Sequence, residues 1–313
     1  MQTIYLQILV NPVAGNGKAS KSFKKLKKLL VQNNIPYEYK VSNYPGELIQ
    51  LAKQYGDQKH AESNRLVVIG GDGSLNEILN GIKLSNHPNT PISYLPAGSG
   101  NDFARAANLN SSPKYFLEQL QQNMAAKKVD CICYQDNTDE KKNYFVNNFG
   151  IGLDAFIVHR SNHQRLKKQM NKLHMGHFIY SMNILSALKN QDTFTIKIVE
   201  DGKISTYDNV YFATTTNHPY FGGGIAILPK ANIYSHKLDL VIVQKPKFRK
   251  FIKLFAKLLK DGSHVTDPHF HYIETNSISI EAFESEYAQI DGEDQAKQIY
   301  KVKFRISSFY LQN

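Results

Sequence analysis

Apolar residues follow two different spacings along the first third of the chain. Short runs with continuous or alternating apolar positions predict β-strands at 4–10, 37–41, 65–71 and 91–96. Between these runs the apolar residues recur at helical spacing, at 20–33, 46–54 and 75–82, and a further helix opens at 101. This alternation predicts a doubly wound parallel sheet with helices on both faces. Phosphate-bearing ligands bind such sheets at the carboxyl ends of the strands.

The pattern changes from about Lys128 onward. Strand-like runs separated by turn residues lie at 129–135, 143–150, 193–200, 209–217, 237–244 and 277–283. They predict an antiparallel β-sandwich, interrupted by helices at about 164–189 and 247–260. The last strand-like segment, 299–313, is expected to return to the first domain. The predicted organisation is therefore α/β plus all-β, with an α/β domain at 1–127 and 298–313 and a β-sandwich domain at 128–297.

Length and composition agree with two folded domains. Of the 313 residues, 42% are hydrophobic and 21% are charged, so each domain can bury a core. Cys131 and Cys133 are separated by a single residue of their predicted strand, and we expect no disulfide between them, which favours a reducing, cytoplasmic location. No apolar run reaches the ~18 residues of a membrane-spanning helix. The formal net charge of +11 favours an acidic partner: a nucleotide, an anionic lipid or a nucleic acid.

A glycine-rich turn follows the predicted strand at 65–71. It consists of Gly70, Gly71, Asp72, Gly73 and Ser74, and a helix begins directly after it. Glycines let the backbone approach a phosphate closely, and the helix N-terminus adds amide donors. Asp72 would repel that phosphate unless a cation lies between them, which predicts Mg²⁺. Taken alone, the turn is equally well explained by a helix capped through Asp72 or Ser74.

Two more glycine-containing loops follow other predicted strands. The loop within 95–108, LPAGSGNDFARAAN, carries a flexible turn before Asn101 and Asp102, and Asp102 alone would be explained as a helix cap. The loop at 11–18 follows the first strand and ends in Lys18. Because the carboxyl ends of parallel strands meet at one edge of a sheet, three such loops favour a shared phosphate-binding site over three unrelated turns.

These motifs resemble those of a known enzyme family. The sequences GGDGSLNEILNGI (70–82), PAGSGNDFAR (96–105) and NPVAG (11–15) are similar to the signature loops of the diacylglycerol kinase catalytic domain, which sphingosine kinases and bacterial lipid kinases share. The similarity continues through FGIGLDAFI (149–157), FGGGIAILPKA (221–231), KLDLVIV (237–243) and IDGE (290–293). The resemblance implies a fold like that of NAD kinases and diacylglycerol kinases. It also implies ATP-dependent phosphorylation of a lipid hydroxyl, with diacylglycerol as the first expectation.

The resemblance also implies which residues form the site. It places ATP in the α/β domain against Asn11, Pro12, Val13, Ala14, Gly15, Ser42, Gly71, Asp72, Gly73, Ser74, Leu75, Asn76, Glu77, Ser99, Asn101 and Asp102. The general base that removes the acceptor's proton would be Glu293, with Asp291 as the reserve candidate and Asp72 as a further catalytic acid. One Mg²⁺ would be held by Asp239 and the main-chain carbonyls of His236 and Val241. A second would travel with ATP.

The segment 247–260, KFRKFIKLFAKLLK, predicts an amphipathic basic helix. Its apolar face can pack on the sandwich, or the helix can contact an anionic membrane surface, and both can hold in part. Since the implied substrate is a membrane lipid and no spanning segment is predicted, we expect peripheral association from the cytoplasm. Antiparallel edge strands offer one route to a homodimer.

Other functions compete with this interpretation. An NAD kinase or phosphofructokinase-like enzyme shares the GGDG loop, but the GSGNDFAR loop argues against it. A basic nucleic-acid-binding protein fits the charge, yet the sequence has no zinc, helix-turn-helix or RNP-like signature, so we expect no nucleic-acid partner. A lipid-binding pseudokinase is disfavoured because Asp72, Asp102, Asp239 and Glu293 are all present. The lipid alcohol stays open among diacylglycerol, sphingoid base, ceramide, monoacylglycerol and polyprenol.

Overall fold

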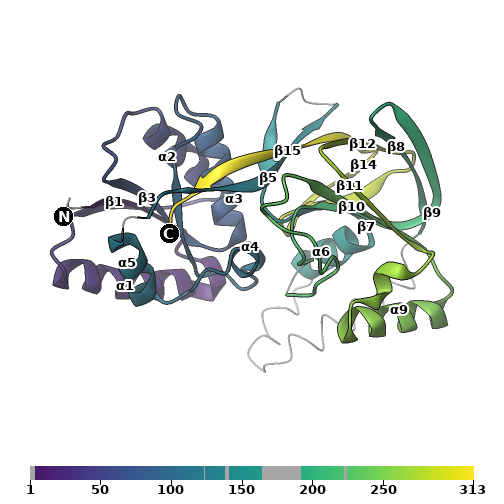
Figure 1. Cartoon of the computed structure of the whole chain (residues 1–313), viewed down its shortest axis with the longest axis horizontal. Helices are drawn as coiled ribbons and strands as arrows, with labels where there is room; N and C mark the ends of the chain where they lie inside the picture. Colours follow the sequence, from purple (N-terminus) through teal and green to yellow (C-terminus); the bar gives the residue numbers. More distant parts are fainter. Residues whose placement is uncertain (1–3, 123, 138–140, 164–191, 222–223) are drawn as a thin grey trace.

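The computed structural model describes residues 4–122, 124–137, 141–163, 192–221 and 224–313. A helix-rich part that contains both chain ends lies beside a strand-rich part (Figure 1). The elements of the first part are β1 Tyr5–Val10, α1 Ala14–Gln32, β2 Tyr37–Val41, α2 Glu47–Gly56, β3 Asn64–Gly70, α3 Asp72–Lys83, β4 Ile92–Pro96, α4 Asp102–Ala106 and α5 Pro113–Gln121. They alternate strand and helix, as the apolar pattern predicts.

The second part consists mainly of strands. Its elements are β5 Lys127–Asp136, β6 Asn143–Phe145, β7 Asn148–Gly152, α6 Leu153–His163, β8 Phe194–Glu200, β9 Lys203–Thr216, β10 Leu238–Gln244, α9 Phe248–Lys260, the 3₁₀-helix η2 Ser263–Thr266, β11 Phe270–Thr275, β12 Ser277–Ala282, β13 Glu286–Ile290, β14 Glu293–Gln298 and β15 Lys301–Leu311. Within the described residues, hydrogen bonds join the strands of both parts into one sheet of fifteen strands.

The order of the strands separates the two parts of this sheet. Strands β2, β1, β3 and β4 are parallel neighbours. The C-terminal strand β15 lies between β4 and β12, and it pairs with β5 over almost its whole length. The strands of the second part pair antiparallel with one another. The chain therefore ends beside β4, where Gln312 N donates to Ile92 O at 2.9 Å.

Both faces of the parallel sheet are covered by helices. Leu6, Ile8 and Val10 of β1 pack on the side of α1 and α5, and Leu9 packs on the side of α2 and α3. Strand β3 divides in the same way, which explains why its central residues 66–69 are all apolar and buried. The loops at the carboxyl ends of these strands are thereby held on a rigid support.

Both faces of strand β10 in the second part are likewise buried. Leu238, Leu240 and Ile242 belong to the inner core of the β-rich part, while Val241 and Val243 pack on its other side with α9. A continuous apolar run therefore fits this antiparallel strand, because neither of its faces meets water.

The structure confirms the predicted fold class. The helix predicted at 247–260 is present as α9, whereas the one predicted at 164–189 lies outside the described residues. The single strand predicted at 143–150 is wrong, because β6 ends at Phe145 and β7 begins at Asn148. The domain boundaries stay a prediction, since β5 and β15 extend the sheet from one part into the other. No helix among the described residues is long and apolar enough to cross a bilayer.

Candidate active site

A large cleft lies at the carboxyl ends of the parallel strands and has a volume of about 880 Å³. One wall comes from the α/β part and the other from residues of β5 and β6 and the turn between β13 and β14. The predicted site residues that line it are Asn11, Pro12, Val13, Ala14, Gly15, Ser42, Gly71, Gly73, Ser74, Asn76, Glu77, Ser99, Asp291 and Glu293. The structure thus brings most of the predicted nucleotide-binding residues together with both candidates for the general base.

Close backbone packing shapes the floor of this cleft. A Cβ added to Gly98 would lie 2.5 Å from the Cα of Gly71, and one added to Gly15 would lie 2.2 Å from the carbonyl oxygen of Ala97. Gly15 also has a φ of 59°, which favours glycine. The three loops therefore touch one another through main chain, and larger residues at these glycines would push them apart.

Side chains of neighbouring loops fix the same arrangement. Asn11 Nδ2 donates to Ser74 Oγ at 3.0 Å, which joins the loop after β1 to the start of α3. The main-chain N–H of Gly46 donates to Glu77 at 3.1 Å and ties the loop after β2 to α3. Asn11, Ser74 and Glu77 all line the cleft, so these hydrogen bonds stabilise its wall.

Two aspartates lie behind this wall. The N–H of Asp102 donates to Asp72 Oδ2 at 3.0 Å, while Asp102 forms an ion pair with Arg105 and accepts the N–H of Gly224 at 3.0 Å. Burial raises the pKa of Asp72 to about 7, and the charges of Asp102 and Asp291 add to the effect. Asp72 is thus a poorly solvated carboxyl group beside other acids.

The donor set at Asp72 fits a magnesium ion. Its Oδ1 is buried and has no hydrogen-bond partner among the described residues, although a carboxylate in such a place normally finds one. A hard cation that takes oxygen ligands would satisfy that atom and relieve the repulsion from Asp102. The described residues contain no group of three or more His, Cys, Asp or Glu that could hold a metal alone, so such an ion would need further ligands such as water or phosphate.

Asp291 holds the turn that faces the glycine loops. It accepts hydrogen bonds from the N–H groups of Val146 (3.0 Å), Asn147 (2.8 Å) and Asn148 (3.1 Å), and from the side chain of Asn76 (2.8 Å). Burial raises the pKa of Asp291 to about 6, against these hydrogen bonds. The three main-chain donors explain why the strand is interrupted between β6 and β7, since these N–H groups bind a carboxylate and not a neighbouring strand.

Glu293 begins β14 on the other side of Gly292 and is exposed to the cleft. A Cβ added to Gly73 would lie 3.7 Å from Glu293 Oε1, so this carboxylate stands directly opposite the glycine turn. The turn itself requires positive φ values, 49° at Asp291 and 85° at Gly292. Glu293 is therefore the carboxylate of the turn that is exposed to the cleft, and Asp291 is the one that is hydrogen-bonded within the protein.

Several predicted residues do not line the cleft. Leu75 is buried in the core of the α/β part, and Asn101 accepts the N–H of Gly98 at 2.8 Å and so stabilises its own loop. Asp72 and Asp102 lie behind the wall, as described above. These four shape the site from outside the cleft surface.

The residues predicted to hold the protein-bound Mg²⁺ lie in the β-rich part, away from the cleft lining. Asp239 is buried and accepts the hydroxyl of Tyr272 at 2.6 Å, and burial raises the pKa of Asp239 to about 6. His236 uses its main-chain N–H and its ring to bind Asp130, at 2.7 and 2.9 Å. The metal site at Asp239, His236 and Val241 stays a prediction.

Sequence reasoning missed the residue that connects the β-rich part to the Asp291 turn. Gln289 is buried; its Oε1 accepts the N–H of Gly292 at 2.8 Å, and its Nε2 donates to Asn148 and, at 3.1 Å, to Asp154. Its position two residues before Asp291 was the only signal in the sequence. These hydrogen bonds connect the turn to Asp154, which lines an apolar pocket.

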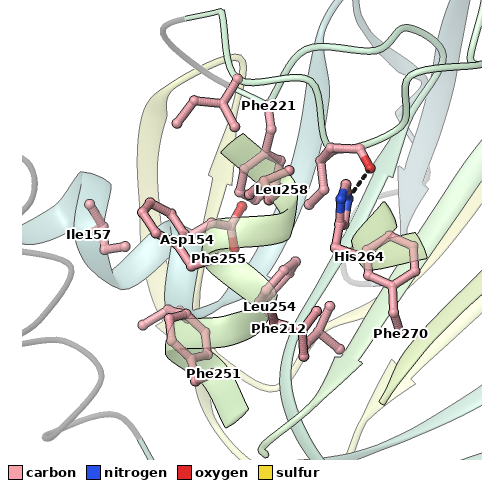
Figure 2. A pocket seen from close by; sticks show the side chains of 14 residues that line it. Asp154, Ile157, Phe212, Phe221, Phe251, Leu254, Phe255, Leu258, His264 and Phe270 are labelled. Carbon is pink, nitrogen blue, oxygen red and sulfur yellow. Dashed lines mark hydrogen bonds between the residues drawn. The ribbon is translucent and has the colours of Figure 1, made fainter. Parts of the chain in front are cut away.

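This pocket lies between α9 and the sheet (Figure 2) and holds about 90 Å³. Its lining is apolar apart from Asp154 and His264, and it includes Ile157, Phe212, Phe251, Leu254, Phe255, Leu258 and Phe270. The ring of His264 is bonded to the carbonyl oxygen of Ile227 at 2.8 Å. Burial raises the pKa of Asp154 to about 6, and its Oδ1 has no partner among the described residues. The pocket suits an apolar ligand with one polar group.

Comparison with known proteins gives the same assignment for both parts. Residues 5–133 match the diacylglycerol kinase catalytic domain, and residues 148–307 match the YegS C-terminal NAD kinase β-sandwich-like domain. The chain is 28% identical to YtlR of Bacillus subtilis over 82% of each chain. It is 24% identical to a diacylglycerol kinase of the same species over 92% of this chain and 89% of that one.

Solved structures share the fold. A diacylglycerol kinase from Bacillus anthracis str. Sterne superposes with a TM-score of 0.73 at 20% identity, over 100% of this chain and 98% of that chain. Yeast NADH kinase complexed with NADH gives a TM-score of 0.51 at 10% identity, over 98% and 82%. At these identities the likeness shows the fold alone. The two family matches cover nearly the whole chain, and the chain belongs to the diacylglycerol kinase catalytic domain family.

Proposed function

We propose that this kinase transfers the terminal phosphoryl group of ATP to a lipid hydroxyl, and that the lipid is diacylglycerol, which becomes phosphatidic acid. The observation that carries the proposal is the position of Glu293, an exposed carboxylate directly opposite the glycine turn in one cleft. Phosphoryl transfer to an alcohol needs the phosphates, the hydroxyl and a proton acceptor within one site. The Bacillus subtilis relative that carries the name diacylglycerol kinase, 24% identical over 92% of this chain, supports the choice of lipid.

Glu293 acts as the general base in this proposal. It accepts the proton of the lipid hydroxyl while the hydroxyl oxygen bonds to the γ-phosphorus and the bond from that phosphorus to ADP breaks. Asp291 is less suited to this step because four hydrogen bonds already occupy its two carboxylate oxygens. Its role is to position the turn so that Glu293 faces the glycine loops.

The α/β part binds the nucleotide. Gly71, Gly73 and Ser74 line the cleft at the N-terminus of α3, where main-chain N–H groups would bind phosphate oxygens without a side chain in between. Asp72, with its buried and unbonded Oδ1, would hold the metal together with Asp102. When bound there, Mg²⁺ would neutralise part of the negative charge of the phosphates.

The apolar pocket supports a lipid acceptor over a soluble one. Its lining would bind part of an acyl chain, and Asp154 at its wall would accept a hydrogen bond from a polar group of the same molecule. A substrate of this kind resides in a bilayer, so the reaction takes place at the membrane surface.

A kinase assay with labelled ATP tests the proposal. Dispersed short-chain diacylglycerol, a sphingoid base, ceramide, monoacylglycerol and a polyprenol serve as acceptors, and NAD serves as the soluble control. We expect phosphate on diacylglycerol that requires Mg²⁺ and is lost in the Glu293→Gln variant. Phosphate on NAD alone would contradict the lipid acceptor, and phosphate on another lipid alcohol would contradict the choice of diacylglycerol.

A further inference from the structure

Helix α9, Phe248–Lys260, presents three different faces. Phe251, Leu254, Phe255 and Leu258 form the inner face and line the apolar pocket (Figure 2). Phe248, Ile252 and Leu259 follow each other at intervals of four and seven residues and form a second stripe. This second stripe does not line the pocket.

The second stripe is unusually exposed for its residue types. The relative exposure is 58% for Phe248, 50% for Ile252 and 61% for Leu259. Single exposed apolar residues are common on protein surfaces, but three on one stripe of one helix mark an interaction surface. We call these three residues the outer stripe.

Basic residues flank the outer stripe on its far side. Arg249, Lys253, Lys257 and Lys260 are exposed, and α9 contains no acidic residue. Arg249 and Lys253 form no ion pair within the described residues. Lys250 differs from them, since it pairs with Asp267 at 3.3 Å on the protein side. The outer stripe thus lies next to a row of cationic groups that face solvent.

We propose that the outer stripe of α9 inserts into the interface of an anionic phospholipid bilayer while its basic row binds the lipid headgroups. The inference rests on the proposed function, because it gives the apolar pocket behind the same helix direct access to lipid. Apolar side chains beside lysines are the pattern of helices that lie in the membrane plane.

Charge favours the bilayer over a second copy of this chain. A symmetric contact through the outer stripe would bring the basic rows of two helices close together, and like charges repel. The formal net charge of +11 opposes self-association further and favours an anionic surface. A bilayer with anionic headgroups provides both the apolar and the charged complement.

The absence of tryptophan from the sequence allows a direct test on the whole protein. Ile252→Trp places a single fluorophore on the outer stripe, and Ile204→Trp places one at a site of 62% exposure on β9. With vesicles of phosphatidylglycerol and phosphatidylcholine, we expect emission to shift to shorter wavelength, and brominated acyl chains to quench it, for Ile252→Trp only. Equal responses of the two variants, or none from Ile252→Trp while the protein sediments with vesicles, would overturn the proposal.

Partitioning measurements test the two components of the surface. Phe248→Ser with Leu259→Ser should lower vesicle partitioning by about tenfold, whereas Ile204→Ser should not. Lys253→Gln with Lys257→Gln should lower vesicle partitioning by about 25-fold at low salt, which is ~5-fold for each lysine. Lys24→Gln with Lys28→Gln on α1 removes the same charge at the same spacing and should have a much smaller effect.

Kinase activity on dispersed short-chain diacylglycerol separates this inference from the proposed function. The outer-stripe variants should keep that activity, which also shows that they fold, and lose activity on vesicle-embedded substrate. If the wild-type chain has no such activity, the proposed function fails while the vesicle measurements still stand. A change of oligomeric state in the outer-stripe variants without a change in vesicle partitioning would assign the stripe to a protein partner and overturn the membrane proposal.

Discussion

Asn76 on α3 donates a hydrogen bond to Asp291 at 2.8 Å, although 215 positions separate them in the sequence. Asn76 is the second residue after Ser74 of the glycine turn, and Asp291 is the second residue before Glu293. This bond therefore fixes the distance between the two sides of the proposed site. The same amide also donates to the carbonyl oxygen of Tyr144 at 2.9 Å, which ties α3 to β6.

The Asn76→Ala variant should have a lower kcat, because it removes the hydrogen bond that holds the Asp291 turn against α3. We expect the free energy of unfolding to fall by about 1–3 kcal/mol, because buried acceptors lose their donor. Asn76→Asp should cost more, since a second carboxylate then faces Asp291. Thermal unfolding and kcat measure the two effects. Asn33→Ala, which removes an exposed side-chain bond to Leu29, is the control and should leave kcat unchanged.

Glu293→Gln should separate binding from chemistry. The substitution keeps the shape of the side chain and removes its ability to take a proton, so kcat should fall by about 10²–10⁴-fold while ATP affinity stays within about threefold. Glu284→Gln changes an exposed glutamate whose partner is the N–H of Thr195, and it should not change kcat. Normal turnover of Glu293→Gln would assign the proton transfer to another group.

Asp72→Asn should raise the stability of the nucleotide-free protein and abolish its activity. Burial raises the pKa of Asp72 to about 7, from an ordinary value of 3.8. The folded state then holds the proton of Asp72 more tightly than the unfolded state does. The contribution of this proton to the free energy of unfolding is therefore fully present below about pH 4 and is lost as the pH rises through about 7. Asparagine carries no charge and removes this loss.

We therefore expect Asp72→Asn to be more stable than the wild type by on the order of 1–3 kcal/mol at pH 8, and equally stable near pH 4. Denaturant unfolding at both pH values measures the difference. Mg²⁺ should stabilise the wild type and not the variant at pH 8. Asp57→Asn is the control: Lys53 holds the pKa of Asp57 below its ordinary value, so its loss should not raise stability at pH 8.

The sequence predicts those features that depend on local pattern. The continuous apolar run of β3 and the glycines after it predicted both the parallel sheet and a cleft at its carboxyl edge, because both faces of that strand are buried and its end has no side chains to fill the space. The amphipathic spacing of α9 likewise gave a helix within one residue of its observed bounds.

Features that depend on distant residues could not be predicted in this way. The break between β6 and β7 arises from Asp291, which lies 144 positions from Asn147 in the sequence. The apolar pocket combines side chains from Leu153 to Phe270, none of which is unusual in its own element. One turn exposes Glu293 and places the Asp291 carboxylate against four hydrogen-bond donors, and the sequence alone left their roles open.

Gly98→Ala should weaken nucleotide binding. Its Cβ would lie 2.5 Å from the Cα of Gly71 and 2.7 Å from Asn101 Oδ1, so the two glycine loops must separate. We expect the Kd for ATP to rise by at least about tenfold. Gly202→Ala meets no atom within 4 Å and carries only the conformational cost of its φ of 80°. It should lower stability without any change in the Kd for ATP.

Gln289→Glu should destabilise the turn that carries Glu293, although Gln289 itself does not line the cleft. The new carboxylate can still accept the N–H of Gly292, but it cannot donate to Asn148 and it faces Asp154, whose Oδ2 now binds the Gln289 amide at 3.1 Å. We expect a loss of stability of about 1–3 kcal/mol and a lower kcat, both greater at pH 8 than at pH 6 as the two acids ionise.

Adding Asp154→Asn to Gln289→Glu supplies the rescue experiment. The asparagine amide can donate to the new carboxylate. The contact then again consists of one amide donor and one carboxylate, as in the wild type. Stability should recover in the double variant beyond the sum of the two single changes, measured as a coupling energy between Asp154 and Gln289. Recovery of kcat together with stability would show that the turn acts through its position. Recovery of stability alone would mean that Asp154 itself contacts the substrate, as its place in the pocket wall allows.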